Sequence, residues 1–266
     1  MRFQDRRTLI TGGSDGIGAE LALQLAREGA RLHLVGRRRD ALAQVAATAG
    51  RGTSFSIADL ADPAQNRRAL DEGLAALGGL DLLVLNAGIS GHALLEQVTD
   101  LDWYEQMLRV NVLAGIWMTH AALPVLKASH GQIVAISSLA GLTGVPGRTA
   151  YCASKFGQTG FFEALRVELA PAGIAVTTIY PGVVATRIRE RGYGPDGKSL
   201  GYSSLDDSDA MPVAECVRQM LPAIAARRRE LVMTAKGRLA RWLKLIAPGL
   251  VDQLARKALS KEAPGR

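Results

Sequence analysis

The sequence predicts a doubly wound α/β fold, in which one parallel β-sheet of about seven strands carries helices on both faces. Short apolar stretches alternate along the chain with longer stretches in which apolar residues recur at helical spacing. This alternation is typical of β-α-β units, which build parallel sheets. Several short stretches are apolar throughout, as at residues 82–85, and such strands are covered by helices on both sides.

The elements follow one another in a regular order. We expect strands at residues 8–11, 32–36, 53–58, 82–85, 132–137, 175–180 and, more weakly, 230–233. Helical patterns lie near residues 17–28, 40–49, 63–77, 101–128, 150–170 and 213–228. Ligands of such sheets bind at the carboxyl ends of the strands, so residues that directly follow a strand are the first functional candidates.

The charge distribution separates a main domain, residues 1–235, from a basic tail, residues 236–266. The chain of 266 residues is 48% hydrophobic, enough for a substantial core, and carries a net charge of +7. Residues 227–266 hold 11 Lys or Arg against three acidic residues, a net charge of +8, so residues 1–226 sum to −1. The main domain therefore gives no reason to expect a nucleic-acid partner.

Cysteine usage and the N-terminal residues indicate a cytoplasmic protein. Cys152 and Cys216 are too few for a disulfide framework or a cysteine-based zinc site, and we expect no metal. Residues 1–7 lead into the first strand without the apolar region of a signal peptide. No run approaches the roughly 18 to 20 apolar residues of a membrane-spanning helix.

A glycine-rich loop follows the first strand and opens the first helix. Glycines let a backbone turn tightly and approach a pyrophosphate, and the start of a helix favours an anion. The spacing differs from GxGxxG, and the Lys-Ser or Lys-Thr pair of a Walker loop is absent. The loop predicts a cradle for the phosphates of a dinucleotide, with a ligand-free turn as the alternative. Its residues are Thr11, Gly12, Gly13, Ser14, Asp15, Gly16, Ile17 and Gly18.

Three consecutive arginines, residues 37–39, follow the second strand, where an NAD site usually places a carboxylate for the ribose 2′-hydroxyl. Arginines suit a 2′-phosphate, so the sequence favours NADP over NAD, with Arg37 as the contact. Solvated arginines remain the alternative, and Asp15 brings a negative charge into the glycine loop. Asp59, after the third strand, could accept a hydrogen bond from the adenine amino group or cap the next helix, although Asp62 is better placed to cap it.

Tyr151 and Lys155 lie four residues apart in a predicted helix, so their side chains share one face about a turn apart. A cation within about 4 to 6 Å of a phenol favours the phenolate, which would let a tyrosine exchange its proton nearer to neutral pH. An isolated pattern of this kind more often marks a packed tyrosine and a solvated lysine. The Tyr151 and Lys155 pattern therefore indicates a proton-transfer site only in combination with the other motifs.

Together these motifs resemble the classical branch of the short-chain dehydrogenase/reductase family, over about residues 5–233. Leu85 departs from the family pattern, which commonly has a second asparagine there. The resemblance implies a Rossmann-like fold and an oxidoreductase that interconverts a secondary alcohol and a ketone with a nicotinamide cofactor. It also rests on Asn86-Ala87-Gly88, Asn111, Ser138 at 13 positions before Tyr151, and Pro181-Gly182 followed by Thr186.

The resemblance also implies roles for single residues. Ser138 would hold the substrate carbonyl oxygen, and Tyr151 would be the general acid in reduction and the general base in oxidation. Lys155 would bind the nicotinamide ribose and favour the phenolate, and Asn111 would hold a water that links the lysine to solvent. The cofactor contacts would be Tyr151 and Lys155 together with Gly12, Ser14, Gly16, Ile17, Gly18, Arg37, Asp59, Asn86, Ala87, Gly88, Pro181 and Gly182, with Val184 and Thr186 at the nicotinamide carboxamide.

Residues 187–212 lack clear periodicity and directly follow the nicotinamide contact, as expected of a substrate lid. Tyr193, Tyr202 and His92 could line the substrate pocket, although loop tyrosines are often simply exposed. The resemblance further implies a homodimer or homotetramer built through the helices near residues 101–128 and 150–170.

In the tail, Leu239, Trp242, Leu243 and Ile246 recur at helical spacing, with the basic residues between them turned away. Residues 248–249, Pro-Gly, should end this helix. A basic amphipathic helix can lie on an anionic membrane, or pack on its own domain or on a second subunit. The tail is also similar to those of family members that reduce lipid or steroid ketones at membranes, which implies a hydrophobic carbonyl or alcohol substrate.

The sequence thus predicts an NADP-dependent oxidoreductase for a hydrophobic small molecule. Two alternatives use the same fold. A nucleotide-sensing binding protein would normally lack the tyrosine or the lysine, and a membrane-peripheral scaffold would bind membranes through the tail without turning over a ketone. The complete set of Asn111, Ser138, Tyr151 and Lys155 argues against both as sole functions.

Overall fold

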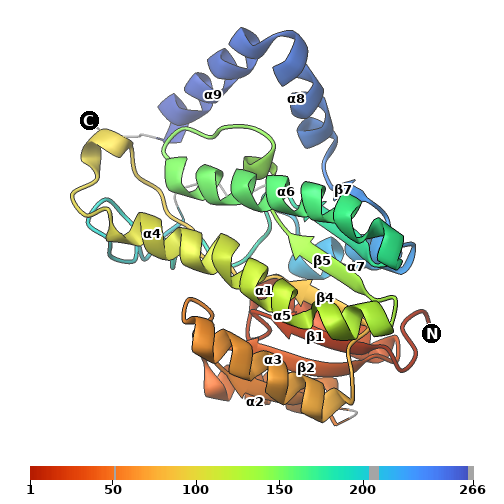
Figure 1. Cartoon of the computed structure of the whole chain (residues 1–266). Helices are drawn as coiled ribbons and strands as arrows, with labels where there is room; N and C mark the ends of the chain where they lie inside the picture. Colours follow the sequence, from red (N-terminus) through yellow and green to blue (C-terminus); the bar gives the residue numbers. More distant parts are fainter. Residues whose placement is uncertain (51, 204–209, 263–266) are drawn as a thin grey trace.

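A seven-stranded parallel sheet forms the centre of the computed structural model, which describes residues 1–50, 52–203 and 210–262 (Figure 1). The strand order is β3-β2-β1-β4-β5-β6-β7, so the chain reverses direction across the sheet between β1 and β4. The doubly wound prediction is confirmed, and every predicted strand lies within one residue of an observed one at each end. The strands are β1 (Arg7–Thr11), β2 (Arg31–Gly36), β3 (Ser54–Ile57), β4 (Leu82–Leu85), β5 (Gln132–Ile136), β6 (Ala175–Tyr180) and β7 (Glu230–Val232).

Helices connect the strands and cover both faces of the sheet (Figure 1). Two of the short helices matter for the site, the π-helical turn η2 (Arg109–Leu113) and the 3-10 turn η3 (Leu139–Gly141). The others are η1 (Leu95–Gln97) and η4 (Ala170–Ala172). The α-helices are α1 (Gly16–Arg27), α2 (Arg39–Ala49), α3 (Pro63–Leu77), α4 (Asp102–Leu108), α5 (Ala114–Ala128), α6 (Thr149–Leu169), α7 (Val213–Ala225), α8 (Ala235–Ile246) and α9 (Pro248–Glu262).

The sheet separates two hydrophobic cores because successive strand residues point to opposite faces. On β1, Ile10 packs into a core with residues of α1, α2 and α7. Its neighbour Leu9 packs into a second core with residues of α3, α5 and α6. Both residues are fully buried, which explains why these strands are apolar without alternation.

The start of α3 is capped by a carboxylate that the sequence analysis identified. Asp62 accepts hydrogen bonds from the backbone N–H groups of Ala64 and Gln65 at 2.8 and 3.2 Å, as expected for the cap of α3. Asp59 instead accepts from the backbone of Ala61 at 3.1 Å. The helix-capping alternative for Asp59 is therefore wrong, and its contact with adenine stays a prediction.

The helix predicted at residues 101–128 is observed as one helical segment, but it contains a π-helical turn that the sequence pattern did not indicate. The π-helical turn η2 inserts an extra residue into the helical repeat between α4 and α5. The expectation that no run approaches a membrane-spanning helix is wrong by length and composition, because the segment Asp102–Ala128 is long and apolar enough to cross a membrane. However, Met118, Ala122 and Leu126 are buried in the second core, so it is placed here as a core helix.

The tail forms α8 and α9, which stand together at one end of the molecule (Figure 1). The basic residues of α8 turn away from its apolar face, as predicted, and they are the residues that face the domain. Arg241 pairs with Glu230 at 2.6 Å, and Lys244 donates to the carbonyl oxygen of Leu142 at 3.2 Å. The apolar face therefore points outward, and Trp242 and Ile246 are 64% and 79% exposed. Packing of this face on its own domain, one of the three alternatives, is excluded for these two side chains.

The oligomer expected through the helices near residues 101–128 and 150–170 stays a prediction. Their outer faces leave apolar side chains in solvent, among them Leu108 at 41% and Val167 at 74% exposure. Residues 204–209 of the predicted lid and residues 263–266 of the predicted tail lie outside the described residues.

The pairing of β1 with β4 supports a prediction about stability. Arg7 donates to Asp81 from its backbone N and its Nε, both at 2.9 Å, and from Nη2 at 2.7 Å. Burial alone would raise the pKa of Asp81, but the hydrogen bonds and charge of Arg7 lower it overall. We expect Asp81→Asn to destabilise the protein by about 1–2 kcal/mol at neutral pH, since the pair is partly solvated.

The pH dependence gives the control for this variant. A carboxyl whose folded pKa is lowered contributes stability above its unfolded value of about 3.9, and that contribution is lost as the pH falls through the folded value. Urea unfolding should therefore give a constant difference between wild type and Asp81→Asn above about pH 5 and a shrinking one below about pH 4. A difference that stays the same across this range would contradict the assignment.

Candidate active site

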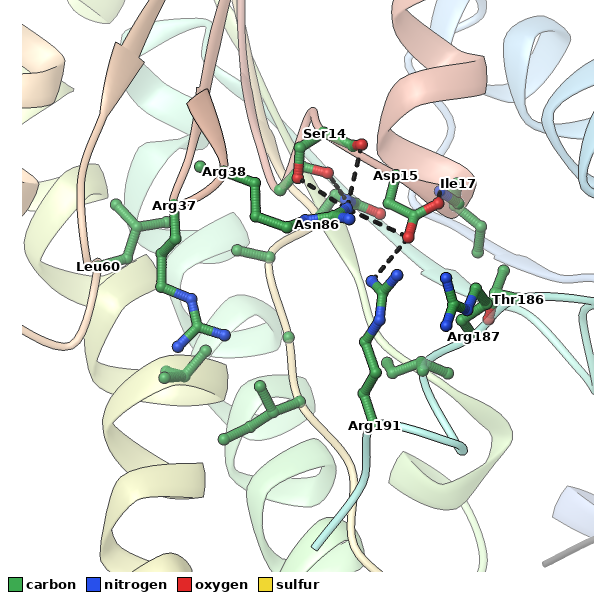
Figure 2. A pocket seen from close by; sticks show the side chains of 18 of the residues that line it. Ser14, Asp15, Ile17, Arg37, Arg38, Leu60, Asn86, Thr186, Arg187 and Arg191 are labelled. Atoms are coloured by element: carbon green, nitrogen blue, oxygen red, sulfur yellow. Dashed lines mark hydrogen bonds and ion pairs between the residues drawn. The ribbon is translucent and has the colours of Figure 1, made fainter. Parts of the chain in front are cut away.

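A cavity of about 360 Å³ lies beside the carboxyl ends of β1, β2 and β4, where the strand order reverses (Figure 2). Loops from five separate parts of the chain line it, including the segment that follows β6. This is the location that the fold class predicts for a ligand. Of the predicted cofactor residues, Gly12, Ser14, Gly16, Ile17, Arg37, Asp59, Asn86, Ala87, Gly88 and Thr186 line the cavity.

The glycine loop is closely packed against the loop that follows β4. Gly12 adopts a φ of 67°, a left-handed conformation that favours glycine. The side-chain amide of Asn86 donates to the carbonyl oxygens of Thr11 and Gly12 at 3.1 and 3.3 Å. Gly18 does not line the cavity, but a Cβ atom there would collide with the Gly12 carbonyl and the Asn86 amide. The loop thus leaves a backbone-lined cradle at the start of α1 that fits a pyrophosphate.

Asp15, the acidic residue in this loop, is neutralised by two arginines (Figure 2). Its carboxylate caps α1 by accepting from the backbone N–H of Gly16 at 2.7 Å. It also pairs with Arg191 at 2.7 Å and with Arg38 at 3.2 Å. Burial alone would raise the pKa of Asp15, but these partners lower it overall. The negative charge of Asp15 was an argument against a phosphate ligand in the sequence. In the structure Arg38 and Arg191 compensate that charge.

Arg37 and Arg38 have different roles in the structure. Arg38 is held by Asp15 and by the carbonyl oxygen of Ser14 at 3.2 Å. Arg37 lines the cavity near Leu60, apart from the Asp15 cluster (Figure 2). In the described part of the chain it has no hydrogen bond or ion pair, and its side chain is exposed. Arg37 is thus the arginine of this pair with donors available to a ligand.

Tyr151 and Lys155 are both buried on the first turns of α6, with 7% and 3% exposure. The Nζ atom of Lys155 lies 5.7 Å from the centre of the Tyr151 ring. It donates to the carbonyl oxygen of Ile136 at 3.0 Å and to Oε1 of Gln158 at 3.3 Å. Burial lowers the pKa of Lys155, the nearby Tyr151 opposes this, and Arg148 adds to it. The lysine is therefore buried beside a phenol and is not a solvated surface residue.

Asn111 connects this pair to the cofactor cavity. It lies in η2, and its side chain exchanges hydrogen bonds with the backbone of Ile89, at 2.8 and 3.0 Å, and donates to Ser154 Oγ at 2.9 Å. Gly88 lines the cavity, and a Cβ atom there would lie 3.3 Å from Asn111 Oδ1 and 3.8 Å from Lys155 Nζ. Asn111 and Lys155 therefore lie at the Gly88 end of the cavity. The water predicted at Asn111 stays a prediction.

Ser138 follows β5, two residues after the carbonyl that Lys155 binds. Its Oγ accepts a hydrogen bond from the backbone N–H of Ala140 at 3.2 Å and thereby caps η3. Ala140 belongs to the same apolar cluster as Tyr151. The cap fixes the serine at the carboxyl edge of the sheet, on the side of the Tyr151 cluster.

Other predicted residues lie away from the cavity. Val184 packs into the first core with 4% exposure, so a cofactor could reach only its backbone. Gly182 is closed in by Thr234, whose Cγ2 would lie 2.7 Å from an added Cβ atom. Pro181 accepts a hydrogen bond from the backbone of Leu139 at 3.2 Å. These residues shape the end of β6 behind Thr186, and their cofactor contacts stay predictions.

On the substrate side, two of the three additional candidates lie together. Tyr193 packs on Trp103, with ring centres 5.7 Å apart, at the edge of the cluster that holds Tyr151. The backbone N–H of His92 donates to the carbonyl oxygen of Tyr193 at 2.8 Å. Tyr202 is 61% exposed and takes no part in this cluster.

Sequence reasoning missed several residues of the site. Ser154 and Gln158 lie three and seven positions after Tyr151, so helical spacing could have placed them on the same face. Arg191 pairs with Asp15 across 176 positions, and no pattern in the sequence indicates that contact. Cys152, which follows Tyr151, is half-buried, and its thiol contacts the backbone of Val145.

Comparison with known proteins identifies the family. A family model described as short chain dehydrogenase matches residues 6–193. The chain is 31% identical over 264 residues to dehydrogenase/reductase SDR family member 7B of Mus musculus, covering 96% of this chain and 81% of that one. It is 33% identical over 250 residues to 11-beta-hydroxysteroid dehydrogenase-like 4A of Arabidopsis thaliana, covering 91% and 81%.

A solved structure shows the same fold. A short chain dehydrogenase/reductase from Burkholderia phymatum, in complex with NAD, superimposes with a TM-score of 0.82 over 94% of this chain and 96% of that one, at 22% identity. The chain therefore belongs to the short-chain dehydrogenase/reductase family and is an oxidoreductase that uses a nicotinamide cofactor and acts on CH–OH groups.

Proposed function

We propose that this protein is an NADP-dependent oxidoreductase that interconverts a hydrophobic ketone and its secondary alcohol. The observation that carries the proposal is the buried Tyr151–Lys155 pair at the Gly88 end of the cofactor cavity. A buried lysine cation beside a buried phenol has no structural need, because apolar residues would fill the same space at lower cost.

The proposed chemistry follows from the positions of four side chains. A bound nicotinamide cofactor supplies or accepts the hydride. In reduction Tyr151 donates its proton to the carbonyl oxygen, which Ser138 holds by a hydrogen bond. Lys155 favours the phenolate that remains, and Asn111 fixes the loop at Ile89 against α6. In oxidation the same tyrosine removes the hydroxyl proton.

The choice of NADP rests on the arginines after β2. The exposed guanidinium of Arg37 lines the cavity without a partner among the described residues, so it can make charge-assisted hydrogen bonds to a 2′-phosphate. Arg38 and Arg191 compensate the Asp15 carboxylate, which would otherwise repel that phosphate. No carboxylate follows β2 at residues 37–39, where an NAD site would place one for the ribose.

The hydrophobic substrate is supported by the surroundings of Tyr151. Its ring packs in an apolar cluster with Trp103 and Met107, and Tyr104 and Tyr193 lie at the edge of that cluster. A substrate that approaches the Tyr151 hydroxyl from this side meets mainly aromatic and aliphatic groups. The names of the Arabidopsis relatives refer to hydroxysteroids, which are molecules of this kind.

The outward apolar face of the tail supports a second proposal, contact with an anionic membrane surface. Leu239, Trp242, Leu245 and Ile246 are between 64% and 79% exposed on α8. The segment of residues 227–266 carries a net charge of +8, and Lys236, Lys244 and Arg256 are exposed within it. An exposed tryptophan with aliphatic neighbours and surrounding cations is typical of helices that lie in a lipid interface.

The catalytic proposal predicts the behaviour of Tyr151→Phe. Removal of the hydroxyl removes the proton donor, so ketone reduction should fall by at least about 10²–10⁴-fold. NADPH binding, measured by fluorescence titration, should be retained, because Tyr151 is not among the residues that line the cavity. Turnover at the wild-type rate in Tyr151→Phe would overturn the catalytic assignment.

The cofactor proposal predicts that Arg37→Ala weakens NADPH binding by about tenfold or more while NADH binding is little changed, because only NADPH carries the 2′-phosphate. Arg39→Ala is the matched control, since Arg39 begins α2 and does not line the cavity. Fluorescence titration with both cofactors makes the comparison. Equal losses for NADPH and NADH in Arg37→Ala would contradict a 2′-phosphate contact.

The membrane proposal predicts that the protein co-sediments with vesicles that contain phosphatidylserine and less with neutral phosphatidylcholine vesicles. Trp242→Ser should reduce vesicle binding by about tenfold, the effect expected from losing a large apolar contact. Val167→Ser, another exposed apolar residue, is the control and should bind as wild type. The alternative is a second subunit on this face. It would be indicated if the protein does not bind vesicles and if its molecular mass in solution rises with protein concentration in the wild type but not in Trp242→Ser.

A further inference from the structure

Arg148 is a second cation at the Tyr151 ring, and the family motifs discussed above do not include it. It is the N-cap residue of α6, three positions before the tyrosine. Its guanidinium carbon lies 4.4 Å from the centre of the Tyr151 ring, and Lys155 Nζ lies 5.7 Å from the same point. The cation that is closer to the ring is therefore the arginine.

The position of Arg148 is fixed by its neighbours. The segment pairs with the loop after β4 through a bridge between Ala93 and Arg148, and the backbone N–H of Ala93 donates to Gly147 at 2.8 Å. The guanidinium donates to the hydroxyl of Ser90, which is 2% exposed. Within the described ranges no carboxylate pairs with Arg148, and its buried Nε has no hydrogen-bond partner. Its charge therefore acts on the ring without a counterion among these residues.

The other groups around Tyr151 do not carry a competing negative charge. The titratable side chains that lie near the ring are Lys155, Cys152, His92, Tyr104 and Tyr193. Burial raises the pKa of the Cys152 thiol, so it stays protonated at neutral pH. Burial lowers the pKa of His92, and Arg148 lowers it further, so the imidazole stays neutral. The local charges are thus two cations in an otherwise apolar cluster.

The two cations differ in how well they keep their protons. Burial and the charge of Arg148 both lower the pKa of Lys155, while Tyr151 raises it. A guanidinium stays protonated at any pH relevant to a protein. In apolar surroundings a phenolate is strongly disfavoured unless a cation compensates it. Arg148 is thus a permanent cation 4.4 Å from the centre of the Tyr151 ring.

We propose that Arg148 is a positioning residue for proton transfer, which acts by stabilising the phenolate form of Tyr151 through its charge on the ring. This role rests on the proposed function, because it matters only if Tyr151 exchanges a proton with substrate. In this proposal two cations stabilise the phenolate, Arg148 before Tyr151 and Lys155 after it. Arg148 itself touches neither substrate nor cofactor in this role.

The test compares Arg148→Met, which keeps the length of the side chain and removes its charge, with Arg148→Lys, which keeps a charge. The phenolate of Tyr151 is titrated by ultraviolet difference absorbance, with Tyr151→Phe in the same background as the reference. We expect the midpoint of the phenolate transition to move up by about one pH unit or more in Arg148→Met and by less in Arg148→Lys. Arg67→Met, on the solvated face of α3, is the control and should leave the midpoint unchanged.

Kinetics provide the second readout. Oxidation needs the phenolate, so the rise of kcat/KM with pH should shift to higher pH in Arg148→Met by the same amount. If Arg148→Met does not fold, as judged by circular dichroism, Arg148→Gln replaces it in both measurements. A folded charge-removing variant whose phenolate midpoint equals that of wild type would overturn the proposal.

The titration needs neither cofactor nor substrate, so it tests the role of Arg148 independently of the proposed function. A shifted midpoint in a protein that turns over no ketone or alcohol would support the electrostatic role of Arg148 and reject the proposed function. Normal turnover with unshifted midpoint and pH profile would keep the proposed function and reject the role of Arg148.

Discussion

The close approach of two loops, one after β1 and one after β4, is the constraint on which the site depends. The side-chain amide of Asn86 reaches the carbonyls of Thr11 and Gly12, and this is possible only because positions 12 and 18 carry no Cβ atom. The contact keeps the cradle at the start of α1 open toward the cavity. It also places Gly88, two residues further on, against Asn111 and Lys155, so one packing contact positions both halves of the site.

The position of Gly88 is linked to that of the buried Lys155 through Asn111. Asn111 is held by the backbone of the next residue, Ile89, and by Ser154 on α6, so α6 is registered against the loop after β4. Lys155 lies one position after Ser154, and its ammonium reaches the end of β5. The π-helical turn around Asn111 allows this, because an extra residue in the repeat rotates one side chain out of the regular helical face. Irregular backbone is thus used where three elements must meet.

The sequence was most informative where a residue's role depends on its near neighbours. Uninterrupted apolar runs located the strands, Asp62 located the start of α3, and spacing brought Tyr151 and Lys155 together. Contacts between distant segments were not readable: Arg191 meets Asp15 only because the segment after β6 folds back over the cavity. The turn at Asn111 was missed because its apolar pattern continues that of the helices on both sides. Arg148 lies only three positions before Tyr151, but as the N-cap of α6 its backbone is not helical, so helical spacing does not place it at the ring.

The tail shows the limit of helical periodicity most clearly. Spacing determined which residues of α8 share a face, but it could not tell which face the domain attracts. On this side the domain presents the carboxylate of Glu230 and the backbone carbonyls of Val232 and Leu142. These groups bind the arginines and the lysine of α8, so the charged face and not the apolar face packs on the domain. Leu142 follows η3, which Ser138 caps, and Gly237 of α8 packs against Leu139 of η3. The charged face of α8 is therefore anchored to the segment that holds Ser138 and η3, and a surface that covers the apolar face of α8 would contact the helix that packs on this segment.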